Sequence, residues 1–247
     1  MRVKTALSEA QNGQAFANLA RAFHLPPAKV EDAVDVMLDA LIPDIGKHMR
    51  SRRSLAGIVA LIGKSGYEQV LETPMQLGAT HTQVLGTEAL NVIAGRSESK
   101  RLVHRAAVVG GISEMIAEYL LPVIAAMLVG ALAKLCRPEL AAIMGHSDEG
   151  APSRQDAFEL PRVSGGVGFA GSTGGSASVA SPAGSESYFV ELAEDICRPA
   201  GASDLADAVR RVLAANLDLT IGPLGWIRRI GVWSALALNA ALAGVRR

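Results

Sequence analysis

The chain has little of several residue types, and each shortage excludes a class of protein. Aromatic residues make up only 4% of the 247 residues, so any core must be largely aliphatic. The two cysteines, Cys136 and Cys197, are too few for a disulfide framework and lack the spacing of a zinc site. The 24 basic residues balance 24 acidic ones, so no overall positive field favours nucleic acid as a partner.

The chain also lacks the motifs of common enzyme classes. It contains no G-x-S-x-G, no H-E-x-x-H and no paired C-x-x-C. Gly166, Gly168 and Gly171 match G-x-G-x-x-G, but the flanking sequence predicts neither the strand nor the helix of a dinucleotide site. The five histidines are scattered, without a pair at ligand spacing on one helix. We therefore expect a protein that is not an enzyme and that needs no cofactor or metal ion.

The N-terminus does not resemble a secretory signal. Arg2 and Lys4 are basic, but the polar segment 8–14 follows where a signal peptide would have an apolar stretch. We expect a cytoplasmic protein, with membrane association left open because of the C-terminal sequence described below.

What the chain has in abundance is apolar residues at helical spacing, which predicts an all-α fold. The segment 113–135 is apolar on nearly every side, with Met115 and Tyr119 among its apolar positions. Ser113 is a suitable N-cap, Pro122 should kink the helix, and Arg137 followed by Pro138 should end it. A membrane span needs about 20 apolar residues, whereas only about 15 lie between Tyr119 and Lys134. We expect the buried core helix of an irregular bundle; a membrane span and a partner-binding helix are the alternatives.

Shorter helices are predicted around this core helix. The capping boxes Ser8–Gln11 and Thr80–Gln83 each predict a helix start, and a longer helix is expected from Pro27 to about Met49. A basic cluster follows the longer helix, in a position where cations suit a helix C-terminus. It is a candidate anion contact and consists of Lys47, Arg50, Arg52 and Arg53.

A change of composition divides the chain into three parts. Residues 1–145 should form the helical domain, and residues 146–187, rich in glycine and serine, a disordered, flexible linker. Residues 188–247 should form C-terminal helices with a hydrophobic tail, in which residues 230–245 carry no charge over roughly 24 Å of helix. The tail could dock on the core, lie in a membrane interface or self-associate. Its candidate contacts are Trp226, Arg228, Arg229, Ile230 and Trp233.

Several short segments resemble the YidB-like family of bacterial helical domains. They are Val84-Leu85-Gly86, the segments 91–95 and 111–112, and above all Leu120-Leu121-Pro122 with the apolar residues up to Gly130. The resemblance extends over about residues 10–140. It implies a compact multihelical array of unknown function, without catalytic residues to carry over.

These observations lead to one principal hypothesis about function and two alternatives. We expect a non-enzymatic helical structural or interaction module that binds an unknown protein partner or itself. The first alternative is a peripheral membrane protein anchored by the C-terminal helix. The second, nucleic-acid binding through residues 47–53, is disfavoured by the neutral net charge.

Overall fold

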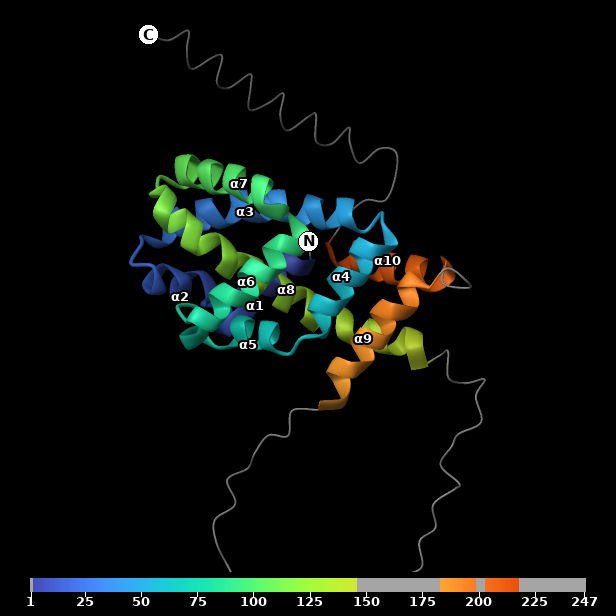
Figure 1. Cartoon of the computed structure of the whole chain (residues 1–247). Helices are drawn as coiled ribbons and strands as arrows, with labels where there is room; N and C mark the ends of the chain where they lie inside the picture. Colours follow the sequence, from blue (N-terminus) through green and yellow to red (C-terminus); the bar gives the residue numbers. More distant parts are fainter. Residues whose placement is uncertain (1, 146–182, 199–202, 218–247) are drawn as a thin grey trace, which may run out of the picture.

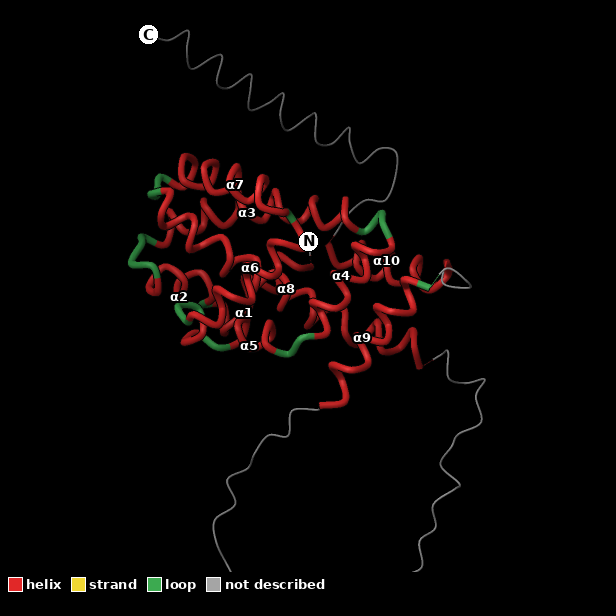
Figure 2. The backbone as a smooth tube through the Cα atoms, viewed as in Figure 1, coloured by secondary structure: helices red, strands yellow, loops and turns green. Residues whose placement is uncertain are grey.

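The computed structural model describes residues 2–145, 183–198 and 203–217, and all the secondary structure in these ranges is helical (Figures 1 and 2). No strand occurs in these ranges, so the predicted all-α class is confirmed. The predicted linker falls largely, and the hydrophobic tail entirely, outside the described residues. The helices are α1 (Arg2–Gly13), α2 (Ala15–Ala22), α3 (Pro27–His48), α4 (Arg52–Gly63), α5 (Gly66–Glu72), the 3-10 turn η1 (Pro74–Gln76), α6 (Thr80–Ile93), α7 (Gly95–Gly110), α8 (Glu114–Gly145), α9 (Ala183–Cys197) and α10 (Ser203–Leu217).

Helix α8 is the centre of the bundle. Every residue from Leu120 to Ala133 is buried, and α1, α3, α4, α5, α6, α7 and α10 all pack against this helix. By length and composition α8 could cross a membrane, but 78% of its most apolar window is buried inside the protein. The observed burial agrees with the predicted core helix.

Two of the segments that carry the family resemblance, Val84-Leu85-Gly86 and Leu120-Leu121-Pro122, meet in space at the crossing of α6 and α8. A Cβ atom on Gly86 would lie only 1.9 Å from the carbonyl oxygen of Pro122, so the two helices approach more closely than a side chain allows. Beside this crossing, the buried hydroxyl of Tyr67 donates a hydrogen bond to the carbonyl of Leu85 at 3.0 Å. Gly86 is therefore required by the close approach of two backbones.

Some predicted helix ends were wrong. Helix α8 continues through Pro138 to Gly145, because Leu140 is fully buried beyond the proline and its packing offsets the lost backbone hydrogen bond. The Ser8–Gln11 box starts no helix: α1 begins at Arg2, and Gln11 has a left-handed φ of 54° while its side chain donates to the carbonyl of Leu71.

The second predicted capping box, Thr80–Gln83, also differs in the structure. Helix α6 begins at Thr80 as expected, but its N-cap is Ala79 and has no side-chain hydrogen bond. The side-chain amide of Gln83 donates instead to the carbonyl of Tyr119 on α8. A long-range contact has thus replaced the predicted local one.

Side chains from distant parts of the chain cap the C-terminal ends of several helices. Arg137 donates to the carbonyl of Ile62 at the end of α4, at 2.9 Å. Arg210 donates to the carbonyl of Met49 just after α3, at 2.8 Å. Cations favour helix C-termini because the carbonyls there are unpaired and the dipole is negative. These contacts join elements that are far apart in sequence.

Helices α9 and α10 pack on the domain formed by residues 1–145. Helix α9 begins at Ala183, five residues before the predicted start of the C-terminal segment at residue 188. It lies against α4, while α10 lies mainly against α8. Their buried apolar residues belong to the same core cluster as α8. The described part of the C-terminal segment therefore shares one core with the first domain.

Candidate functional site

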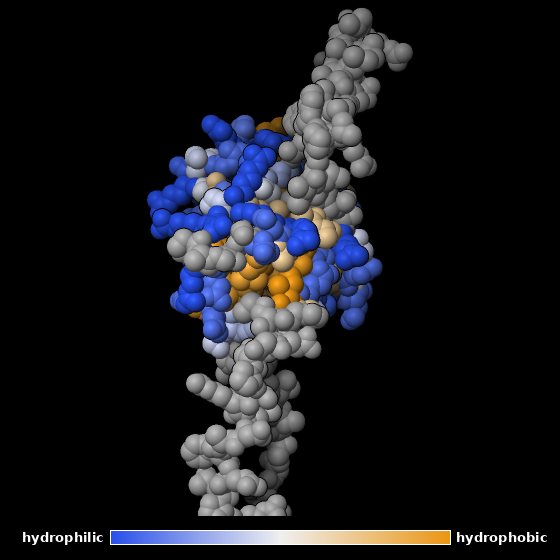
Figure 3. All heavy atoms as spheres, turned by 90° about the vertical axis from the view of Figure 1, so that its right-hand side faces the viewer, coloured by the Kyte–Doolittle hydropathy of each residue, from blue (hydrophilic) through white to orange (hydrophobic). Residues whose placement is uncertain are grey.

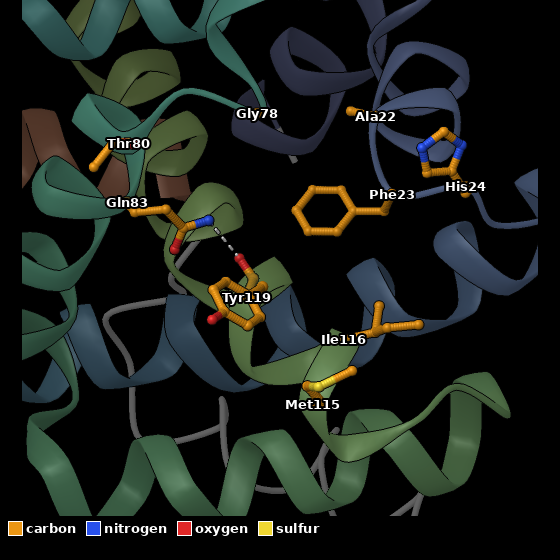
Figure 4. A pocket seen from close by; sticks show the side chains of 9 residues that line it. All are labelled: Ala22, Phe23, His24, Gly78, Thr80, Gln83, Met115, Ile116 and Tyr119. Carbon is orange, nitrogen blue, oxygen red and sulfur yellow. Dashed lines mark hydrogen bonds between the residues drawn. The ribbon is translucent and has the colours of Figure 1, made fainter.

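An open groove lies where the start of α8 meets the corner after α2 and the start of α6 (Figure 4). Its volume is about 540 Å³, and it is open to solvent. Phe23 enters it from the α2 side, and the apolar residues of the first turns of α8 lie opposite. The lining residues are Ala22, Phe23, His24, Gly78, Thr80, Gln83, Met115, Ile116 and Tyr119.

The groove gathers large apolar side chains at the surface. Met115 is 66% exposed and Tyr119 is 59% exposed, and beside them Phe23 and Ile116 are half-buried. Single exposed apolar residues are common, whereas a cluster lining a concave surface is typical of a binding site. Met115 and Tyr119 belong to the apolar positions of the core helix, yet they are exposed, because the surrounding helices enclose α8 completely only from Leu120 onward.

Hydrogen bonds hold two sides of the groove in place. Gln83 Nε2 donates to the carbonyl of Tyr119 at 2.9 Å, which ties α6 to the exposed turn of α8. Thr82 Oγ1 donates to the carbonyl of Gln76 at 2.6 Å and fixes the loop that contains Gly78. The groove is therefore formed by positioned elements before any ligand binds.

The third side of the groove has a strained backbone. His24 follows α2 with a φ of 53°, a left-handed conformation that glycine adopts at helix C-termini without steric cost. The amide of Leu25 donates to the carbonyl of Ala20 at 2.9 Å, which closes this left-handed helix end. A histidine in place of glycine costs on the order of 1 kcal/mol. The strain occurs at a residue that lines the groove.

Burial raises the pKa of two core residues, Cys136 and Tyr67. Burial, together with the charge of Glu139, raises the pKa of the Cys136 thiol to about 12, despite a hydrogen bond with Asn216 that opposes the shift. Burial, then Glu88, raises the pKa of the core residue Tyr67. In the described ranges, no group of three or more His, Cys, Asp or Glu side chains is placed to hold a metal ion. Apart from Tyr119, His24 is the one titratable side chain among the groove residues.

The acidic residues on the outer face of α3 have a basic partner. Lys4 Nζ lies 2.7 Å from Asp39 and 3.4 Å from Asp35. Burial lowers the pKa of Lys4, but the hydrogen bonds and charges of Asp39 and Asp35 outweigh it, so the net shift is upward. The pair joins α1 to α3.

Two of the four predicted anion contacts, Lys47 and Arg52, have partners within the protein. Lys47 pairs with Asp44 at 2.5 Å, and Arg52 donates to the carbonyl of Arg198 at 3.3 Å, where it caps α9. Arg50 and Arg53 are exposed. The tail candidates Trp226, Arg228, Arg229, Ile230 and Trp233 lie outside the described residues.

Sequence reasoning missed the groove, although one signal for it was present. Helical spacing placed Met115 and Tyr119 among the apolar positions of the core helix and did not separate them from its buried residues. Glu114 and Glu118, next to them in sequence, are charged and exposed, which indicates that the first turns of this helix reach solvent. The contribution of Phe23 could not be predicted, because it depends on how the corner between α2 and α3 folds.

Comparison of the whole chain with curated proteins and with solved structures finds no match. A family model for bacterial proteins of unknown function, DUF937, matches residues 5–135. This range covers more than half of the chain and nearly coincides with residues 10–140, over which the family resemblance was predicted. It includes the elements that line the groove, from α2 to the first turns of α8. The chain therefore belongs to the DUF937 family of bacterial proteins of unknown function.

Proposed function

We propose that this protein is a non-enzymatic interaction module, and that its groove binds an apolar side chain presented by a protein partner. The observation that supports this function is the cluster of Met115, Tyr119, Phe23 and Ile116 around one concave surface. An aliphatic or aromatic anchor fits this lining, which offers mostly apolar contact and few polar groups.

The energetics favour an anchor of one or two large side chains. Fully burying a Leu, Ile, Phe or Met side chain contributes about 1.5–3 kcal/mol. A partner side chain would gain this burial and would also cover the exposed surfaces of Met115 and Tyr119. Because hydrogen bonds already position the elements around the groove, binding would order few additional groups.

A peptide selection tests this proposal even though the natural partner is unidentified. A library of displayed helical peptides is selected against the full chain, and the recovered peptides are measured against the Met115→Ser/Tyr119→Ser double variant. We expect peptides with a shared apolar anchor that bind the double variant at least about tenfold more weakly, the loss of 1.4 kcal/mol or more.

The matched control is Val109→Ser, which removes a side chain that is 58% exposed on α7 and does not line the groove. Peptides that bind the groove should bind this control as they bind the natural chain. If all recovered peptides bind the double variant with unchanged affinity, the groove is not the interaction site.

The sequence of the C-terminal tail favours a second candidate function, peripheral membrane association. Residues 230–245 carry no charge, and Trp226, Ile230 and Trp233 would share one face of a helix next to Arg228 and Arg229. The full chain and a Trp226→Ser/Trp233→Ser variant would be sedimented with vesicles, with and without anionic lipid. We expect only the natural tail to carry the protein into the pellet; recovery of both proteins in the supernatant would exclude this function.

A further inference from the structure

Helices α4 and α9 form an antiparallel pair although more than a hundred residues separate them in the sequence (Figure 1). At one end of the pair, Gly63 of α4 lies against Phe189 of α9. At the other end, Arg52 of α4 donates to the carbonyl of Arg198, immediately after α9. The α4 surface, defined here by Arg52 and Gly63 together with Arg137 of α8, thus contacts α9 at both ends.

The α4 surface contains a fitted seat for an aromatic ring. A Cβ atom on Gly63 would lie 2.4 Å from Cβ of Phe189, so only glycine allows this approach. The guanidinium carbon of Arg137 lies 5.8 Å from the centre of the Phe189 ring, within the range of a cation–π interaction. Arg137 is itself held by hydrogen bonds to the carbonyl of Ile62 and to Glu68, each at 2.9 Å.

Helix α9 contacts the domain in the way that an amphipathic helix binds a groove. Phe189, Leu192 and Ile196 are buried, which is a spacing of i, i+3 and i+7. Val190 is 54% exposed, and the charged Glu191 and Glu194 are exposed on the other side. The aromatic residue comes first, and the last carbonyls of the helix meet an arginine.

The α4 surface lies almost entirely within the family domain, but the helix that covers it does not. The family match includes α4 and ends at residue 135, whereas α9 follows residues 146–182. These intervening residues could span on the order of 100 Å when extended, so they do not force α9 to stay on α4. Helix α10 has its own contacts, through Arg210 to α3 and through Asn216 to Glu139 of α8.

The side of the molecule that carries α9 and α10 has further apolar surface. An apolar patch lies on this face among hydrophilic side chains (Figure 3). Half-buried apolar residues on these two helices include Ala193 on α9 and Leu205 and Val212 on α10.

We propose that the α4 surface is a docking site for an amphipathic helix, which α9 occupies in cis and for which a helix of a protein partner competes. The partner helix carries an aromatic residue followed by apolar residues at +3 and +7, the spacing that α9 itself presents. This site is distinct from the groove at the start of α8, and the two proposals stand or fall separately.

The test uses the full chain and a fluorescent synthetic peptide of residues 183–198. In the natural chain α9 occupies the site, so the peptide should bind weakly, because apparent affinity falls with the fraction of open sites. Full-length Phe189→Ala, which loosens α9, should bind the unchanged peptide at least about tenfold more tightly. A peptide with alanine in place of Phe189 should not bind, and adding Gly63→Leu to the loosened chain should abolish binding.

Full-length Val190→Ala is the matched control, because it shortens a neighbouring but exposed side chain of α9. It should bind the peptide as weakly as the natural chain does. If Phe189→Ala keeps its helical circular dichroism and still binds no more tightly than the control, α9 is a fixed part of the domain and the proposal is wrong.

Hydrogen exchange of the natural chain gives an answer even if Phe189→Ala does not fold. A detachable α9 should exchange its amides by local opening, at least about tenfold faster than the buried centre of α8. Equal protection of α9 and α8 would overturn the proposal. Concentration-dependent dimerisation with α9 exchanged between copies would also overturn it, because the competing helix would then come from a second copy of the chain.

Discussion

Two apolar surfaces of the domain, the α4 surface and the groove at the start of α8, differ in whether the described chain covers them. On the α4 surface, Phe189 is 4% exposed, seated against Gly63 and beneath Arg137. In the groove at the start of α8, Met115 remains 66% exposed and Tyr119 59% exposed. The covered surface has the fitted contacts of an interface already formed, whereas the open groove is built from positioned elements and a strained corner. The difference is that α9 covers the α4 surface, whereas the described chain leaves the groove exposed.

The largest loss of stability is expected from a substitution of Gly63, the residue of α4 against which Phe189 packs. In Gly63→Ala the new methyl group would overlap Cβ of Phe189, so α9 must shift or leave. We expect a loss of about 3 kcal/mol in the free energy of unfolding, from the cost of overpacking and the weakened burial of the α9 side chains. Denaturant unfolding followed by circular dichroism measures the loss.

Gly78→Ala is the matched control for this change. A Cβ atom on Gly78 meets no atom within 4 Å, so the same substitution should alter stability by less than about 0.5 kcal/mol. If the two alanine variants prove equally stable, α9 does not depend on the close approach at Gly63.

Alkaline pH should lower the free energy of unfolding through the buried cysteine Cys136. Cys136 is buried on α8, whereas Cys197 is exposed at the end of α9. The folded pKa of Cys136 is raised to about 12 from an ordinary value of 9.0, so above pH 9 the unfolded chain ionises while the folded chain does not. The stability contributed by the neutral thiol is full below pH 9 and is lost toward pH 12, at about 1.4 kcal/mol per pH unit.

The measurement compares unfolding free energies at pH 9 and pH 10.5. The natural chain should lose about 2 kcal/mol more than Cys136→Ala over this interval, because the alanine variant lacks the ionisable group. Cys197→Ala should show the pH dependence of the natural chain. Parallel pH profiles for the natural chain and Cys136→Ala would mean that the thiol is not shielded as the structure indicates.

Much of the fold could be predicted from the sequence, and the sites could not, for a physical reason. The periodicity of residues 113–135 identifies the core helix because burial on all sides requires apolar residues on all sides. The capping boxes predicted from local patterns did not form, because their glutamines make long-range hydrogen bonds instead. Gln83 donates to α8, and Gln11 adopts a left-handed conformation and donates to α5. The groove and the α4 surface both depend on which helices meet, which a single segment does not encode.

Arg137 should have a smaller effect than Gly63, because a flexible side chain can be replaced without a clash. Arg137→Met retains much of the apolar stem but loses the hydrogen bond to the carbonyl of Ile62, the pair with Glu68 and the cation above Phe189. We expect a loss of about 1.5 kcal/mol, typical of a hydrogen bond to a charged group. Thermal unfolding measures it.

The control is Arg101→Met, which removes an exposed ion pair with Glu98 on α7. It should change stability by less than about 0.5 kcal/mol. An effect as small as this for Arg137→Met would show that the arginine does not hold α4, α5 and α9 together.

A substitution of the groove residue His24 should stabilise the fold, whereas the substitutions at the α4 surface should destabilise it. Replacing this left-handed histidine by glycine removes steric strain, so His24→Gly should stabilise the fold by about 1 kcal/mol. The same change removes a groove side chain and frees the corner that positions Phe23, so peptides selected for the groove should bind more weakly. At the α4 surface, by contrast, substitutions should weaken the fold and the docking of α9 together. A His24→Gly variant that gains stability and keeps full peptide affinity would mean that the strain does not serve binding. A His24→Gly variant that gains no stability would mean that the left-handed backbone at His24 is not strained.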